Sequence, residues 1–109
     1  MIVATPVFKD NLQQLPAIDG IQRIDLHTEQ GEVIASIPNE AGKQGSLAVY
    51  HYLAQNFASL DAAAAAHGLE IFGEHTADAK NRPGAHPNID RLLDIINGSG
   101  PLSISTIEA

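Results

Sequence analysis

Strand-like and helix-like patterns are segregated along this chain, which limits the folds it can adopt. Residues 21–27 and 33–37 are rich in β-branched residues or partly alternate, and the short Gly-containing stretch 28–32 joins them, as in a β-hairpin. Between residues 46 and 97 apolar residues recur every three or four positions, which predicts helices, and only 102–107 alternates again. Because strands and helices do not alternate, the pattern predicts an α+β fold rather than parallel βαβ units.

Turn and capping residues set the expected boundaries. A short helix over 7–15 ends at Pro16, and Ser46 is the expected N-cap of a helix that runs to Phe57. A long helix is expected over 59–82 because Pro83-Gly84 would break it there, and another follows over 87–97. We therefore predict one domain, 1–109, in which a small three-stranded antiparallel sheet (the hairpin plus the C-terminal strand) packs on three or four helices.

Charge and composition exclude several classes of function. Thirteen Asp and Glu stand against six scattered Lys and Arg, giving a formal net charge of -7. Such a surface repels phosphate backbones and anionic headgroups, so we expect neither a nucleic-acid nor a membrane partner. The absence of cysteine excludes disulfides, iron–sulfur clusters and thiol catalysis. No signal peptide or membrane span is recognisable, so a cytoplasmic location is expected.

Histidines and acids concentrate in one stretch of the chain. If 59–82 were one continuous helix, four side chains would share a face: His67, Glu70, Glu74 and Asp78. Imidazole and carboxylate groups suit zinc, manganese or iron(II), so this set is the candidate site for a divalent metal. The spacing matches no established metal motif, however, and a solvated helix face explains the same pattern and is the favoured interpretation.

Two other short segments contain residues suited to binding or catalysis. In the first, Gly42, Lys43, Gly45 and Ser46 precede a helix, where backbone N–H groups and a lysine can hold an anion, although an ordinary loop with a serine N-cap is favoured. In the second, His86 lies beside Pro83-Gly84 and could act as a general base oriented by Asp90 or Asp78. A purely structural helix start is the favoured interpretation of His86–Arg91.

Three blocks of this sequence together resemble a known family. They are Gly42–His51 (GKQGSLAVYH), Gly68–Asp78 (GLEIFGEHTAD) and His86–Leu92 (HPNIDRL). With these blocks the chain resembles the DUF2322 proteins, a small bacterial family of unknown function, along nearly its whole length. The resemblance implies a standalone bacterial domain of roughly a hundred residues and supplies no activity or residue roles.

Two functions remain open from the sequence. The first is a non-catalytic protein-interaction or regulatory module of the bacterial cytoplasm, which uses its acidic surface and a sheet edge and forms a homodimer. The alternative is a small metal-dependent or acid–base enzyme centred on His67–Asp78 and His86. The first is favoured because no motif is complete and a small domain has little room for a deep pocket. The sequence does not decide whether the protein is an enzyme.

Overall fold

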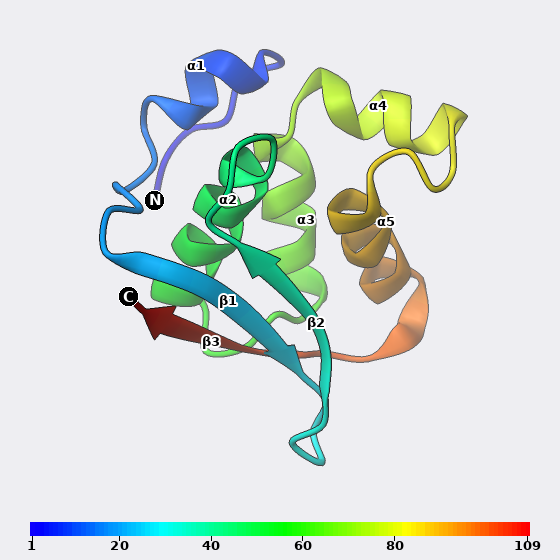
Figure 1. The fold of residues 1–109 in the computed structure, drawn as a ribbon. Coiled ribbons are helices and arrows are strands. Elements are labelled where there is room, and N and C mark those ends of the chain that lie inside the picture. The colour runs from blue at the N-terminus through cyan, green and yellow to red at the C-terminus, as the bar shows by residue number, and fades with distance from the viewer.

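A computed structural model describes all 109 residues, and its elements follow the predicted order (Figure 1). The chain forms five α-helices, one turn of π-helix and three strands. In chain order these are α1 Phe8–Leu12, β1 Ile21–His27, β2 Val33–Pro38, α2 Gln44–Asn56, α3 Ala62–Ile71, α4 Glu74–Asn81, α5 Pro87–Asp94, the π-helical turn Ile95–Ser99 and β3 Ser103–Glu108. None of these helices is long and apolar enough to cross a membrane.

The three strands form an antiparallel sheet in the order β2-β1-β3. The hairpin pairs Ile24 with Ile37, and on the other side of β1, Leu26 pairs with Ile104 of β3. The predicted α+β class is therefore confirmed, as is the pairing of the last strand with the hairpin. Strands that lie far apart in the sequence are side by side in the sheet (Figure 1).

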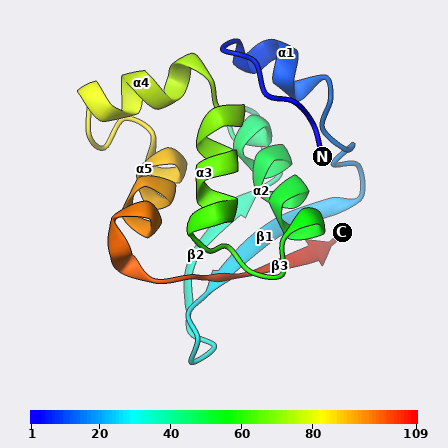
Figure 2. The same cartoon turned by 180° about the vertical axis from the view of Figure 1, so that it is seen from behind.

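One face of the sheet is apolar and covered by helices, whereas the other carries polar groups. Ile24 and Leu26 point to the helical side and are fully buried. On the opposite side, Asp25 accepts hydrogen bonds from the Ser36 hydroxyl (2.7 Å) and from Arg23 Nε (3.0 Å). The Ser36 hydroxyl and then the Arg23 guanidinium lower the pKa of Asp25, which keeps this carboxylate ionised. Figure 2 shows α2 and α3 lying across the covered face.

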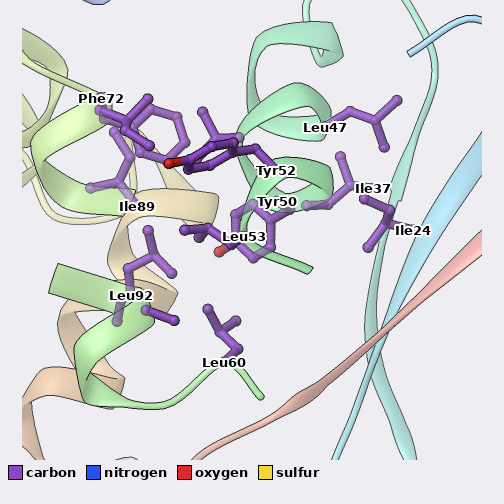
Figure 3. Close-up of a cluster of buried hydrophobic side chains, with 14 of the residues drawn as sticks. Ile24, Ile37, Leu47, Tyr50, Tyr52, Leu53, Leu60, Phe72, Ile89 and Leu92 are labelled. Atoms are coloured by element: carbon purple, nitrogen blue, oxygen red, sulfur yellow. The ribbon is translucent and has the colours of Figure 1, made fainter. Parts of the chain in front are cut away.

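The core lies where α2 packs between the sheet and the other helices. Tyr50 of α2 is fully buried, with Ile24 and Ile37 of the sheet on one side and Ile89 and Leu92 of α5 on the other (Figure 3). This buried cluster extends through α3, whose Gly68 lets the helix approach closely, since a Cβ there would lie 2.9 Å from Leu92 Cδ1. The apolar stripes read from the sequence therefore meet in one core.

The long helix predicted over 59–82 is wrong, because the chain breaks at Gly73. This glycine has φ +57°, and a Cβ on it would lie 2.7 Å from the carbonyl oxygen of Pro6. The backbone N–H of Glu74 donates to that same oxygen (3.1 Å), so the N-terminal segment fixes the bend. The result is one more helix than expected, with α4 directed away from the axis of α3 (Figure 2).

The N-terminal segment is held against α3 and α4 by polar contacts. Asn11 has no exposed surface, and its amide donates to the backbone oxygens of Thr5 (2.8 Å) and Ile71 (2.9 Å). The Glu74 carboxylate accepts from the Phe8 N–H at 3.1 Å, at the first residue of α1. These contacts place the side chains of α1 next to the bend at Gly73.

Candidate functional site

A cleft of about 710 Å³ opens where α1, the end of β2, the start of α2, the bend before α4 and the start of α5 meet. Its volume lies within the roughly 300–1,000 Å³ that is usual for sites of small molecules. A domain of this size was expected to have little room for a deep pocket, yet five separate elements frame this cleft. The chemistry of its walls therefore decides what it can hold.

His86 on the wall of this cleft is bonded to an ionised carboxylate. Its Nε2 lies 2.6 Å from Asp78 Oδ2, and Arg82 also donates to Asp78 through Nε (2.9 Å) and Nη2. The Arg82 hydrogen bonds and then the His86 hydrogen bond hold the pKa of Asp78 well below its ordinary value. A carboxylate can only accept, so Nε2 carries the ring proton and Nδ1 is the unprotonated nitrogen of the neutral imidazole.

A second imidazole lies beside the first. The rings of His75 and His86 have centroids 5.7 Å apart, and both residues line the cleft. The Phe8 ring of α1 meets His75 edge-on, with centroids 5.2 Å apart. His75 is the second residue of α4, so the bend at Gly73 is what directs it to this wall. The cleft wall thus carries two neighbouring imidazole side chains.

Arg91 and the core tyrosine connect the cleft to the interior. The buried Tyr50 hydroxyl donates to the backbone oxygen of Asn88 (2.6 Å), and Arg91 Nη1 donates to Tyr50 Oη (3.2 Å) and to Asn88 Oδ1 (2.8 Å). Burial raises the pKa of Tyr50 to about 12, so the phenol stays neutral. Arg91 is held by neutral partners alone.

The predicted anion-binding segment lies in the same cleft. Gly42, Lys43, Gly45 and Ser46 all line it, and Gly45 is packed so closely that a Cβ would lie 3.2 Å from the Phe8 ring. The predicted cap is wrong, since α2 begins at Gln44 with Lys43 as N-cap, and Ser46 lies within the helix. The cap position is therefore occupied by a side chain that makes no capping hydrogen bond.

The four predicted metal ligands are not brought together. His67 Nε2 lies 2.8 Å from the Tyr52 hydroxyl, Glu74 contacts the start of α1, and Asp78 is bonded to Arg82 and His86. Glu70 is exposed on α3. No group of three or more His, Asp or Glu side chains is arranged to hold a metal ion. The predicted shared face depended on one continuous helix, and the bend at Gly73 separates its two halves.

The predicted catalytic residues His86 and Asp90 are not hydrogen-bonded to each other. Asp90 Oδ2 accepts from the backbone N–H of Gly84 (2.9 Å), whereas Asp78, the other orienting residue considered, contacts His86. Phe8, His75 and Arg91 line the cleft although none of them was among the predicted site residues. Nothing in the local pattern identifies Phe8 or Arg91, because tertiary packing brings them to the cleft.

Comparison with known proteins gives one match. No curated protein and no solved structure matches the chain significantly. Residues 8–106 match a family described as an uncharacterized protein conserved in bacteria (DUF2322), which covers all of the helices and nearly all of the sheet. The chain therefore belongs to the DUF2322 family.

Proposed function

We propose that the cleft is an acid–base active site for a small molecule in the bacterial cytoplasm, with His86 as the catalytic residue. The observation that carries this proposal is the 2.6 Å hydrogen bond between His86 Nε2 and Asp78 Oδ2 on the cleft wall. An imidazole oriented by a carboxylate has one defined tautomer and a free nitrogen for proton transfer. No metal is needed for this chemistry.

In the proposed reaction His86 Nδ1 takes a proton from the bound molecule and later returns it. This nitrogen has no hydrogen-bond partner in the protein, and the positive ring that forms is stabilised by Asp78 through Nε2. Arg82 holds the Asp78 carboxylate in place from the exposed side of α4. His75 lies next to His86 and is suited to the complementary role of proton donor.

The test is turnover in D₂O of a panel of small carbonyl compounds and esters, followed by NMR. Proton abstraction appears as replacement of a carbon-bound hydrogen by deuterium, and hydrolysis appears as new signals. General acid–base groups typically contribute about 10²–10⁴-fold, so His86→Gln is expected to lower the rate by that factor. Asp78→Asn should cause a smaller loss. His51→Gln is the matched control, since His51 lies on α2 and does not line the cleft.

Two results would contradict this function. One is a compound that binds in the cleft, shifting the His75 and His86 resonances, but is recovered undeuterated and intact from the wild-type protein. The other is conversion at the same rate by the wild type and His86→Gln. Either result would make the cleft a binding site without acid–base chemistry at His86.

A second candidate function, protein interaction, is favoured by the free edge of the sheet. β2 is an edge strand, and its Val33 and Ile34 side chains are 51% and 48% exposed. Exposed apolar residues on a strand edge are suited to pairing with another copy of this chain. Light scattering should then give a dimer at micromolar concentration that Ile34→Lys converts to a monomer, and a wild-type monomer would refute the homodimer.

A further inference from the structure

We infer that the cleft is built for a molecule with an oxyanion group, a phosphate or a carboxylate, and that Arg91 is its main contact. The inference deepens the proposed function and rests on it for the reaction, whereas anion binding itself does not depend on that function. Its basis is the charge of the cleft compared with that of the whole protein.

Arg91 is a half-buried cation with no acidic partner. Only its Nη1 is used, by Tyr50 Oη and Asn88 Oδ1, and no carboxylate lies within 4.0 Å of the guanidinium. The remaining N–H donors of its planar fork make no hydrogen bond to the protein. Partial burial removes water from this charge, so an incoming anion would pair with it more strongly than at an open surface.

Lys43 adds a second positive charge at another wall. Its Nζ lies 3.8 Å from Glu40, but both side chains are more than half exposed, so this pair is weak and easily exchanged. Lys43 also precedes the thirteen-residue helix α2, whose first N–H groups add a partial positive charge in the same direction. A flexible cation of this kind is suited to closing over an anion that Arg91 already holds.

The strongest support is that the cleft lining contains no acidic residue. The protein has thirteen acids and a net charge of -7, yet no Asp or Glu is among the eighteen residues that line the cleft. Three acids contact charged or titratable lining residues from outside the lining. Asp78 is bonded to His86 and its charge is matched by Arg82, whereas Glu74 lies 3.6 Å from His75 and the exposed Glu40 lies 3.8 Å from Lys43. The charged and titratable side chains of the lining are two cations and two histidines, so the cleft attracts anions that the rest of the surface repels.

The geometry also gives the anion a purpose in the reaction. A charged end held at Arg91 would fix the orientation of a substrate whose remaining part faces His86, the last residue before α5. His86 is the N-cap of α5 and Arg91 lies within this helix, so one element presents both groups to the cleft. Anionic carbonyl compounds and phosphate esters have this combination of charge and a transferable proton.

Binding of inorganic phosphate to the ¹⁵N-labelled full chain tests the inference by NMR titration, with sodium chloride at matched ionic strength as reference. We expect saturable shifts at Gly42, Gly45 and the Arg91 side chain. Arg91→Gln should raise the apparent Kd about tenfold or more, the size expected for lost charge-assisted hydrogen bonds. Lys43→Gln should raise it less, and Lys80→Gln, a cation outside this cleft, should leave it unchanged. Malonate titrated in parallel distinguishes a carboxylate site from a phosphate site.

Three results would overturn the inference: neither anion saturates the cleft, chloride reproduces the same shifts, or Arg91→Gln binds as the wild type does. If Arg91→Gln is not folded, Lys43→Gln in the exposed loop and Arg91→Lys supply the comparison. Failure here is distinct from failure of the catalytic proposal. Turnover of a neutral compound that depends on His86 would keep the acid–base function and remove the anion, whereas tight phosphate binding without turnover of any compound would do the reverse.

Discussion

The hydroxyl of Tyr50 should make stability depend on pH in the alkaline range. The pKa of this buried phenol is raised from 10.0 to about 12, chiefly by burial. A raised pKa means that the folded state keeps the proton longer than the unfolded chain does. The stabilisation is therefore complete below pH 10.0 and is lost as the pH rises to about 12.

The magnitude follows from the size of the shift. One pKa unit corresponds to about 1.36 kcal/mol, so a shift from 10.0 to about 12 corresponds to about 3 kcal/mol of unfolding free energy lost across this window. Tyr50→Phe removes the ionisable group and also leaves the Asn88 carbonyl without its donor. At neutral pH the variant should be less stable by about 1–3 kcal/mol, and this deficit should shrink to roughly zero by pH 12.

Urea unfolding followed by circular dichroism, at pH steps from 8 to about 12, measures both effects. Lysine titration affects wild type and variant alike, so the difference between their free energies isolates the phenol. In Tyr52→Phe, Tyr50 is the sole tyrosine in a chain without tryptophan, so phenolate absorbance gives its pKa directly. A wild-type minus Tyr50→Phe difference that stays constant across the window would refute a buried neutral phenol.

Three further predictions concern the backbone and the acid side of the pH scale. Gly73→Ala should destabilise the fold by more than the ~1–2 kcal/mol that a left-handed backbone conformation costs a residue with a Cβ, because this Cβ would also lie 2.7 Å from the Pro6 oxygen. A thermal melt equal to that of the wild type would disprove the tight bend. Gly68→Ala should lower the free energy of unfolding by a smaller amount, within the about 1–3 kcal/mol that is typical of overpacking. The Leu92 methyl at 2.9 Å can rotate away, and the higher helix propensity of alanine offsets about 1 kcal/mol; denaturant midpoints measure the difference. Asp78→Asn should reduce the loss of stability on acidification below about pH 3.8. The lowered pKa of Asp78 stabilises the fold above that pH, and this stabilisation is lost as the carboxylate is protonated. Acid titrations of the wild type and the variant that coincide would contradict this prediction.

Much of the fold follows from local pattern. The hairpin 21–37, the helix stop at Pro83-Gly84 and the strand near the C-terminus were all predicted, because apolar spacing and turn residues are properties of short segments. The break at Gly73 was not, since an isolated glycine is tolerated inside a helix and the helical face of Leu69, Phe72 and Thr76 continues across it. What fixes the bend is a carbonyl from Pro6, far away in the sequence.

The candidate site was likewise predictable from the sequence only in part. The contact between His86 and Asp78 was among the alternatives considered from the sequence, because a loop at Pro83-Gly84 returns one helix against the other. The combination of the segment 42–46 with His86 and Arg91 in one cleft was not predicted. The sequence treats these as separate segments, and their meeting depends on how α2 and α5 pack around Tyr50.

The pairing of β1 with β3 has a consequence for how the chain acquires its structure. The central strand meets its second partner only after all five helices have been synthesised. An isolated two-stranded hairpin is marginally stable in water, so during synthesis the hairpin should remain in exchange with unfolded conformations. Such distant pairings also slow folding, because a long loop must close before the contacts form. We therefore expect the helices to associate first and the sheet to be completed in the final, cooperative step.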